Sequence, residues 1–546
     1  MKKILLIYIL FSTLTSFSQV AENSYRLFLT DKNNNSYTLS SPEEFLSQKA
    51  LDRRTKYNIE INQSDLPISQ AYLDSLNSLG LQILNTSKWL NSIVVHSTDH
   101  ELIDTITQLE FVKSTEKIAN NLTPSAKRIL FAKSHLTEVL KQDDHLDYGY
   151  GTTQISMING HALHINGYKG QNMTIAVIDA GFYNVDILPA FDSLRFNNQI
   201  LGTRDFVDGD QQVYDASDHG MKVLSTMGAN MPGQLIGTAP KAGYWLLRSE
   251  NTSTEFSIEE DNWVAAAEFA DSIGCDIITS SLGYTEFDDA LQNYSYADMD
   301  GNTAFITKAA DMAASKGILV LNSAGNLADD PWTYISAPAD GDSVLTVGAV
   351  DAFADYAYFS GIGPTYDGRI KPNVAAMGYQ TSVQGSSGAI AVANGTSFST
   401  PIIAGMAACL WQYYPDLNNM EIIKKIEESA HQYTNPDNKL GYGIPDFAKA
   451  AELTETTISK FIDQAIIKIY PNPFTEHIQI EITQKLTQDI FVELFNITGH
   501  KISEHKYSQV KSTIIRISNL SKLSSGIYLL KITIGDQVIQ KSISKI

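Results

Sequence analysis

Residues that could form a nucleophilic centre occur in the order Asp, His, Ser along the chain. Asp179 ends the apolar run 174–178, so a buried strand would carry a carboxylate at its end. His219 stands before Gly220 at the start of a helical stretch, where little crowds its ring. Each motif is weak alone, because strands often end in Asp and a single His is more often structural. Together they could form an acid–base pair in which the carboxylate orients the ring and the ring takes a proton.

The candidate nucleophile is Ser397, which lies in Asn-Gly-Thr-Ser-Phe-Ser-Thr-Pro (394–401), directly before the apolar helix predicted over 402–413. The free backbone N–H groups and the dipole of a helix start favour negative charge. A serine is a poor nucleophile until a base removes its proton. The alternative is a plain helix cap, which we favour for Ser399. The presence of Asp179 and His219 favours the nucleophile for Ser397.

Asn326 follows the predicted strand 318–321, and its side-chain amide could donate a hydrogen bond to an oxyanion. Loss of one such donor costs about 10²–10³-fold in rate. The chain order Asp, His, Ser excludes the usual α/β-hydrolase arrangement, in which His comes last. Ser397 also lacks the Gly-x-Ser-x-Gly elbow, which argues against a lipase or esterase.

The elements that must position these residues are short apolar strands alternating with helices over residues 148–455. This pattern is typical of an α/β fold with a parallel sheet covered by helices on both faces. In such folds the active site gathers at the carboxyl ends of the strands. The predicted strands are 174–178, 245–248, 277–279, 318–321 and 344–347, and the predicted helices include 260–273 and 303–316.

The rest of the chain divides into further segments. Residues 19–118 alternate strands and helices, including a helix from Ser41 toward Arg54, and predict a small α+β domain. Residues 119–147 are polar and read as a linker. Residues 464–546 hold short alternating strands separated by turn pairs, which indicates a β-sandwich.

Residues 1–18 have the pattern of a secretory signal peptide: Lys2 and Lys3, a short apolar stretch, then small residues. The stretch is too short to span a bilayer, and we expect no membrane span elsewhere. The chain has 546 residues, 43% hydrophobic and 18% charged, as folded multidomain proteins do. Its net charge of −21 argues against nucleic acid or anionic lipid as partners.

Neither the cysteines nor the acidic loops predict an obligatory metal. Cys275 and Cys409 lie among apolar or small residues, so we expect two buried free thiols, although export permits a disulfide, and no zinc site. The loop 296–302 has closely spaced oxygen ligands but lacks the final Glu of an EF-hand. We favour a solvated turn there and leave calcium open; the chemistry requires no cofactor.

Residues 150–450 resemble the subtilisin-like serine proteases, the subtilases, on the motifs around Asp179, His219, Asn326 and Ser397. The resemblance implies a secreted serine endopeptidase acting on proteins or peptides. Asp179 would orient His219, His219 would take the proton of Ser397, and Ser397 would form the acyl-enzyme. Asn326 and the backbone N–H of Ser397 would form the oxyanion hole.

The resemblance also implies the substrate-binding segments. Ser281-Leu282-Gly283 would pair with substrate as an added strand, and Ser323-Ala324-Gly325 would wall the first specificity pocket. Ser336, before Ala337-Pro338, would lie at the base of that pocket. Ser336 is small and uncharged and has no acidic neighbour in sequence. We therefore expect a preference for large apolar or aromatic residues before the scissile bond, unless Asp340 or Asp342 reaches the pocket.

The chain departs from the family pattern at several positions. Ala180 replaces the usual Thr or Ser after the aspartate, Met221 replaces the usual Thr after His-Gly, and Phe398-Ser399 replaces the usual Met-Ala. The first change removes a hydroxyl that could steady the carboxylate. None of them removes a member of the Asp–His–Ser set.

Both terminal segments carry resemblances of their own. Residues 19–118 are similar in position and element order to inhibitory subtilase prodomains. Residues 464–546 resemble the sorting domains of the Bacteroidetes type IX secretion pathway, through Tyr-Pro-Asn-Pro-Phe (470–474), 492–499 and Leu-Ser-Ser-Gly-Ile-Tyr (523–528). This implies the secretion machinery as a partner and an extracellular or outer-surface location. The alternative function is a catalytically weak, protease-like surface protein whose terminal sandwich does the binding.

Overall fold

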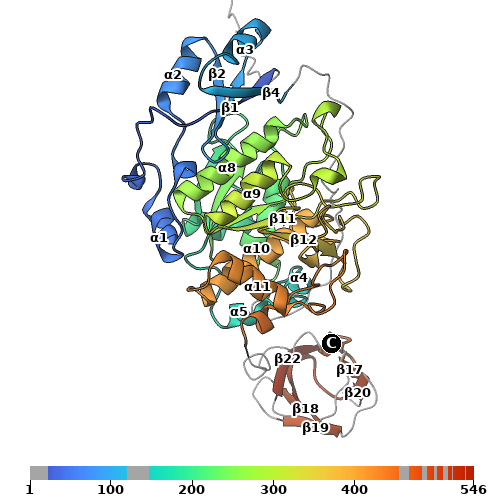
Figure 1. Cartoon of the computed structure of the whole chain (residues 1–546). Coiled ribbons are helices and arrows are strands. Elements are labelled where there is room, and N and C mark those ends of the chain that lie inside the picture. Colours follow the sequence, from blue (N-terminus) through green and yellow to red (C-terminus); the bar gives the residue numbers. More distant parts are fainter. Residues whose placement is uncertain are drawn as a thin grey trace, which may run out of the picture.

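The computed structural model describes residues 23–119, 147–453, 467–482, 489–496, 501–507, 514–518, 520–534 and 537–546. The predicted signal peptide 1–18 and most of the predicted linker 119–147 lie outside these ranges. Figure 1 shows an N-terminal domain in blue, a central domain in teal to orange and a C-terminal domain in red.

The central domain is built on a seven-stranded sheet in the order β13-β12-β11-β10-β5-β9-β6, and every neighbouring pair is parallel. This confirms the predicted α/β fold. The strands are β5 (Thr174–Asp179), β6 (Ile200–Asp205), β9 (Gly243–Arg248), β10 (Ile277–Ser280), β11 (Leu319–Ser323), β12 (Val344–Val350) and β13 (Val374–Met377).

Helices cover both faces of this sheet. Successive side chains of a strand point to opposite faces, so the apolar side chains of β5 need a packing partner on each side. Ile175 and Val177 point into one hydrophobic cluster, whereas Ala176 and Ile178 point into the other. The first cluster contains α7 (His219–Gly228), α10 (Thr396–Tyr413) and α11 (Asn419–Ser429), and the second contains α8 (Ile258–Ile273) and α9 (Phe305–Ser315).

Smaller elements fill the edges of the central domain. They are α4 (Thr152–Ser156), α5 (His161–Ile165), α6 (Asp192–Phe196), α12 (Phe447–Ala450), the strand pair β7 (Asn230–Met231) and β8 (Leu235–Ile236), and the strand pair β14 (Thr381–Gln384) and β15 (Ile390–Ala393).

The N-terminal domain is a four-stranded antiparallel sheet in the order β2-β3-β1-β4, with two helices packed on it through a core of its own. Its elements are β1 (Ser24–Leu29), α2 (Gln70–Ser78), β2 (Gln82–Ser87), β3 (Ser92–His96), α3 (His100–Ile106) and β4 (Val112–Lys117).

The single helix expected from Ser41 toward Arg54 is wrong. The chain instead forms a short 3-10 turn at Pro42–Glu44 and then a separate helix, α1 (Gln48–Lys56). This helix begins after Ser47, whose side chain accepts a hydrogen bond from Ala50 N. A serine oxygen is a strong helix cap, so the chain starts a new helix there. Figure 1 shows α1 beside the central domain, away from the N-terminal sheet.

Buried ion pairs join the N-terminal domain to α8. Arg26 pairs with Asp261 at 2.6 Å, and Asp271 receives both Arg53 at 2.6 Å and Arg54 at 2.9 Å. Lys88 lies 3.7 Å from the same Asp271. The cations come from the N-terminal domain and the carboxylates from the central domain, so the two surfaces are electrostatically complementary.

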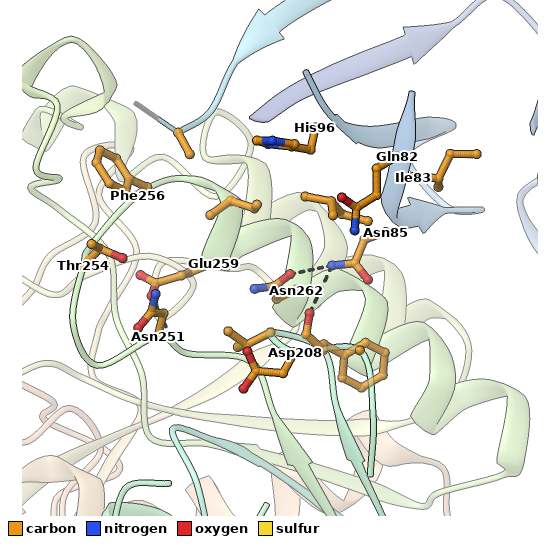
Figure 2. Close-up of a pocket in the computed structure, with 16 residues that line it drawn as sticks. Gln82, Ile83, Asn85, His96, Asp208, Asn251, Thr254, Phe256, Glu259 and Asn262 are labelled. Atoms are coloured by element: carbon orange, nitrogen blue, oxygen red, sulfur yellow. Dashed lines mark hydrogen bonds between the residues drawn. The ribbon is translucent and has the colours of Figure 1, made fainter. Parts of the chain in front are cut away.

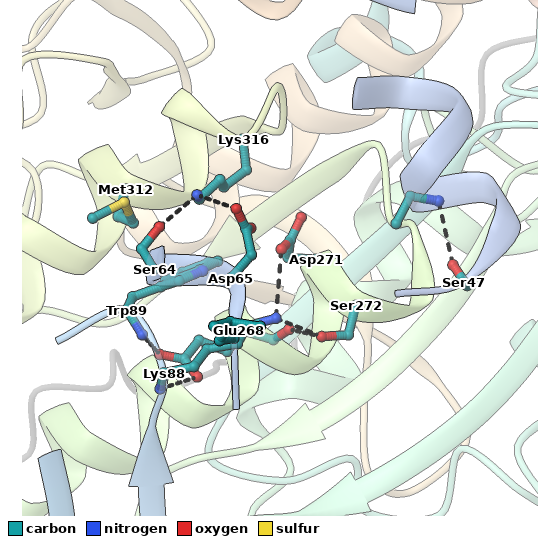
Figure 3. Close-up of polar contacts among 12 residues, drawn as sticks. Ser47, Ser64, Asp65, Lys88, Trp89, Glu268, Asp271, Ser272, Met312 and Lys316 are labelled. Atoms are coloured by element: carbon teal, nitrogen blue, oxygen red, sulfur yellow. Dashed lines mark hydrogen bonds and ion pairs between the residues drawn. The ribbon is translucent and has the colours of Figure 1, made fainter. Parts of the chain in front are cut away.

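Figure 3 shows the middle of this interface. Glu268 of α8 accepts hydrogen bonds from Ser87 Oγ at 2.6 Å, Lys88 N at 2.9 Å and Trp89 N at 2.9 Å. One ion pair has the charges the other way round: the cation Lys316, which follows α9 in the central domain, lies 3.1 Å from Asp65 of the N-terminal domain.

The C-terminal domain consists of two antiparallel sheets that share one hydrophobic core. One sheet is β16 (Ile467–Tyr470), β17 (Ile478–Ile482) and β20 (Ile514–Ile517). The other has the order β19 (Lys501–Tyr507), β18 (Ile490–Asn496), β21 (Gly526–Ile534) and β22 (Gln537–Lys545).

Cys275 and Cys409 are both buried free thiols, as expected. Within the described ranges, no helix has the length and apolar character needed to cross a membrane.

Candidate active site

Asp179 and His219 form a buried pair at the carboxyl end of the central sheet. Asp179 is the last residue of β5, and His219 is the first residue of α7. The Nδ1 atom of His219 lies 2.7 Å from Oδ1 of Asp179. Both side chains are almost fully removed from solvent. The carboxylate therefore fixes the ring so that its other nitrogen, Nε2, faces away from Asp179.

Ala180 stands where the subtilase pattern has Thr or Ser, and the effect of this difference is seen in the hydrogen bonds of the Asp179 carboxylate. Oδ1 of Asp179 also accepts from Ala180 N at 2.7 Å. Oδ2 is buried and receives no hydrogen bond from the residues that the structure describes. A Thr or Ser at position 180 would carry the hydroxyl that Ala180 lacks. The other departures, Met221 and Phe398, are core side chains.

Ser397 is the second residue of α10, and its neighbour Phe398 packs against the His219 ring, with ring centroids 5.8 Å apart. This contact brings the start of α10 to the imidazole. The Ser397 hydroxyl donates to the carbonyl of Ser281 at 3.3 Å, and the Ser281 hydroxyl donates to the carbonyl of Ser397 at 2.9 Å. Ser399 instead donates to Thr396 O at 3.0 Å within the helix, so it is not a cap.

Asn326 is oriented by the residue before the candidate nucleophile. Its Oδ1 accepts from Thr396 N at 2.8 Å and from Thr396 Oγ1 at 2.9 Å. Because the oxygen is held by these two donors, the Nδ2 donor must point to the other side. Asn326 and Ser397 line the same pocket. The backbone N–H of Ser397, in the first turn of α10, adds a further donor there.

The pocket beside Ser397 collects most of the predicted substrate-binding residues. Those in its wall are Ser281, Leu282, Gly283, Ser323, Gly325 and Ser336. The Oγ of Ser336 is buried and has no hydrogen-bond partner within the described part of the chain. A Cβ at Gly283 would lie 2.1 Å from this oxygen, so a larger residue at that wall position would have to displace the Ser336 hydroxyl.

Ala324 lies behind this wall. It is fully buried in a small cluster with Ile335 and Ala339 and does not line the pocket. Neither predicted acidic neighbour reaches the pocket. Asp340 accepts hydrogen bonds from Gly301 N at 2.8 Å and Thr307 Oγ1 at 2.7 Å, and Asp342 pairs with Arg369 at 2.8 Å.

Two acidic residues that the sequence reasoning missed do line the pocket: Glu250 and Glu255. The expectation of a pocket without a carboxylate is therefore wrong. Both residues lie in the loop between β9 and α8, more than 20 positions before Ser281 and about 80 before Ser336, so neighbourhood in sequence could not reveal them. The only available signal was the repeated Glu over 250–260 in an otherwise polar loop.

Glu259 of α8 joins these two residues, and carboxylate oxygens of all three lie within 4.8 Å of one another. Burial raises the pKa of Glu250 to about 7, and the charge of Asp179 adds to the shift. Burial, followed by the neighbouring carboxylates, raises the pKa values of Glu255 and Glu259 well above the ordinary range. Such a cluster could hold a cation.

The loop 296–302 forms a turn, as expected: Asp298 accepts a hydrogen bond from Ser295 N, and Asp300 accepts one from Asn302 N.

A second cavity, of about 950 Å³ including open solvent, lies between the N-terminal and central domains. Figure 2 shows Gln82, Asn85 and His96 on one side, and Asn251, Glu259 and Asn262 on the other. The Nδ2 of Asn85 contacts Oδ1 of Asn262 across the gap. Because one wall belongs to the N-terminal domain, this cavity would not stay enclosed without it.

A model of the subtilase family of S8 peptidases matches residues 170–443, just over half of the chain, and this protein belongs to that family. It is a subtilisin-like serine protease. It is 30% identical to subtilisin NAT of Bacillus subtilis subsp. natto over 320 residues, 57% of this chain and 74% of that protein. It is 32% identical to the serine protease AprX of Bacillus subtilis over 303 residues, 50% of this chain and 64% of that protein.

Two further family models match the flanking domains. The S8 propeptide domain of Bacteroidota matches residues 24–132, and the secretion-system C-terminal sorting domain matches residues 468–545. The chain therefore carries a propeptide and a type IX sorting domain, and it is a secreted or cell-surface protein.

A solved structure shares the fold. The serine protease that processes the epidermin leader peptide in Staphylococcus aureus aligns with a TM-score of 0.51 and 16% identity, over 79% of this chain and all of that chain.

Proposed function

We propose that this protease is a catalytically competent endopeptidase that cleaves peptide bonds through an acyl-enzyme on Ser397. The observation that carries the proposal is the 2.7 Å contact between His219 Nδ1 and Asp179 Oδ1, with the start of α10 packed on the same imidazole. A carboxylate on Nδ1 leaves Nε2 as the proton acceptor, and it stabilises the imidazolium that forms when the ring takes a proton.

In the proposed reaction, Nε2 of His219 removes the Ser397 proton as Oγ attacks the carbonyl carbon. The ring then gives this proton to the leaving amine, and a water molecule hydrolyses the acyl-enzyme by the same steps. Nδ2 of Asn326 and the N–H of Ser397 donate to the oxyanion. The Ser397 hydroxyl, now on the Ser281 carbonyl, would turn to the ring when substrate covers that strand, because catalytic hydrogen bonds often tighten only in the complex.

We further propose that the N-terminal domain acts as an inhibitory prodomain and that the C-terminal domain directs the enzyme to the type IX machinery. The buried ion pairs to α8 support a tightly docked prodomain. No cofactor takes part in these steps. Calcium binding remains an independent proposal that a metal titration of stability would test.

The test is labelling with a serine-directed fluorophosphonate. We expect the processed wild-type protein to be labelled on Ser397 and to hydrolyse casein. The variants Ser397→Ala and His219→Ala should lose both properties while keeping the thermal midpoint of a folded protein. Wild-type protein that stays unlabelled and inactive after removal of the prodomain would favour the alternative, a protease-like surface binding protein.

A further inference from the structure

The pocket beside Ser397 has a mixed wall that the family assignment does not explain. Leu282 and Leu327 supply apolar surface, Gly283 and Gly325 leave open space, and Glu250 and Glu255 supply carboxylates. The pocket measures about 470 Å³, including its opening to solvent. A ligand that suits this wall has an apolar stem and a positively charged end.

The carboxylates in and behind this pocket make no ion pair with a Lys, Arg or His among the described residues. The nearest base along the chain, Arg248, lowers the pKa of Glu250 by its charge and donates from Nε to the Glu250 backbone carbonyl at 3.3 Å. Its Nη1, however, is paired with Asp205 at 2.6 Å and Asp208 at 2.7 Å. Burial and the closeness of these carboxylates, which lie within 4.8 Å of one another, raise their pKa values, so an incoming cation would stabilise the charged form that the empty pocket disfavours.

One buried polar atom supports a ligand in this pocket. The hydroxyl of Ser336 is buried in the pocket wall and has no hydrogen-bond partner in the described structure. Oε2 of Glu259 also has no partner there, but Glu259 lines the cavity beside the N-terminal domain, where Figure 2 shows it next to Asn251. Buried polar atoms without partners are rare and usually mark a missing ligand or water.

We propose that Glu250 and Glu255 form a subsite that binds a Lys or Arg side chain of the substrate. The inference rests on the proposed function, and it replaces the apolar preference expected from the sequence. The methylene groups of the substrate side chain pack against Leu282 and Leu327, and its charge meets the two carboxylates. Glu259 adds negative charge from behind. The subsite accepts the residue at one fixed position among the four that precede the scissile bond.

A metal ion suits the cluster less well. Oε1 of Glu250 already accepts two hydroxyl protons, from Tyr284 and from Ser249, and these protons would face a metal bound to that oxygen. A calcium ion would also need six to eight oxygen ligands, whereas Leu282 and Leu327 present carbon to the pocket. A side chain with a charged end uses both kinds of wall.

The experiment profiles the processed enzyme on a peptide library in which each of the four positions before the cut is varied. We expect Lys and Arg to be enriched at one position. In the double variant Glu250→Gln/Glu255→Gln, the ratio of kcat/KM for Lys over norleucine at that position should fall about 10-fold or more, since a desolvated charge loses its partner. Both glutamines keep the shape and the acceptor oxygen of the native side chain.

Glu428→Gln is the matched control, because Glu428 is an exposed glutamate on α11, away from the pocket. It should leave the Lys-to-norleucine ratio unchanged. Glu255→Lys should move the preference toward Asp or Glu at the same position. Fluorophosphonate labelling identifies the variants that are folded and processed, so a misfolded variant is not misread as a change in preference.

The outcomes separate the two proposals. A labelled wild-type enzyme with no enrichment of Lys or Arg, or a double variant that keeps the preference, overturns this inference and leaves the proposed function. A wild-type chain that neither labels nor hydrolyses overturns both. If calcium raises the thermal midpoint of the wild type but not of the double variant, and no cationic preference exists, the cluster is a metal site and the inference is wrong.

Discussion

Ser281 and Ser397 are joined by two hydrogen bonds that run in opposite directions. The Ser397 hydroxyl donates to the Ser281 carbonyl, and the Ser281 hydroxyl donates to the Ser397 carbonyl. The second bond compensates for Pro401, which lies inside α10 and has no N–H to offer to the carbonyl four residues earlier. Ser281, which directly follows β10, thereby satisfies the Ser397 carbonyl that the proline leaves open.

This relationship predicts the effect of Ser281→Ala. The buried Ser397 carbonyl would lose its donor, so the free energy of unfolding should fall by about 1–3 kcal/mol. Replacing Pro401 by Ala restores an N–H, so the loss caused by Ser281→Ala should be smaller in that background. Denaturation of the four combinations, each with Ser397→Ala to prevent self-digestion, measures the coupling. Equal losses in both backgrounds would contradict the compensation.

Asn326 should act on the transition state and not on substrate binding. Asn326→Ala should lower kcat by about 10²–10³-fold with little change in KM. Asn326→Asp keeps the oxygen that accepts from Thr396 but removes the amide donor, so it should lose activity while keeping the fold. Steady-state kinetics with one peptide substrate distinguish the two parameters. A rise in KM at constant kcat would assign Asn326 to binding only.

The prodomain should remain attached when the nucleophile is missing. We expect Ser397→Ala, produced alone, to keep residues 19–118, whereas the wild type should cut itself between about residues 120 and 148, the polar segment read as a linker. Intact mass of the two purified proteins checks this. A correctly trimmed Ser397→Ala protein would show that another enzyme processes the chain.

Arg26 should dominate the docking of that prodomain. In the Ser397→Ala chain, Arg26→Met leaves the buried Asp261 without its cation and should cost about 3–5 kcal/mol of stability. The matched control is Lys113→Met, since Lys113 is an exposed residue of β4 in the same domain. Thermal unfolding compares the two, and an equal effect would assign no special role to the Arg26 pair.

Glu250 should make stability depend on pH. Its pKa is raised from 4.5 to about 7, so the folded state binds a proton that the unfolded state has released between these values. Stability from this group is therefore complete below about pH 4.5 and lost as the pH rises through 7. Glu250→Gln should flatten this part of the curve.

The measurement is the unfolding free energy of Ser397→Ala, with and without Glu250→Gln, between pH 4.5 and pH 8. Other groups face Glu250 and titrate or carry charge themselves, so the difference between the two proteins is the quantity to follow. These groups are Asp179, Arg248, Glu255, Glu259 and Tyr284, and Glu260 and Asp288 act on Glu255 in turn. Identical curves would mean that Glu250 is ionised throughout.

The C-terminal domain should be separable from the protease. Its hydrophobic core shares no residue with the two clusters of the central domain. Deleting residues 464–546 should therefore leave a foldable enzyme that stays in the periplasm. Cell fractionation of the native host with activity assays locates it. Efficient appearance of the truncated enzyme at the cell surface would remove the sorting role.

The sequence was most informative where chemistry and a secondary-structure boundary coincide. Asp179 ends β5 and His219 begins α7, as the pattern indicates, whereas α10 begins at Thr396, before the predicted start at residue 402, so that Ser397 lies in its first turn. Hydrophobic runs define such boundaries locally. The break between the 3-10 turn and α1 was not predicted, because the polar pattern is continuous there, whereas in the structure the Ser47 side chain caps a new helix.

Glu250 and Glu255 show what local patterns cannot supply. Their loop carries no motif, and its path over the pocket is set by contacts with residues far along the chain, such as the bond from Tyr284 to Glu250. Only the folded chain brings this loop to Ser336 and Ser397.

The interface on α8 has a consequence for the kinetics of an enzyme that has lost its prodomain. Arg26, Arg53, Arg54 and Lys88 leave with the prodomain, and Asp261, Glu268 and Asp271 then face water. An uncompensated negative surface on the helix next to the pocket attracts positively charged proteins over a distance of about 8–10 Å at ordinary ionic strength. Substrate capture by the mature enzyme should therefore be faster for basic proteins and should slow as salt is added.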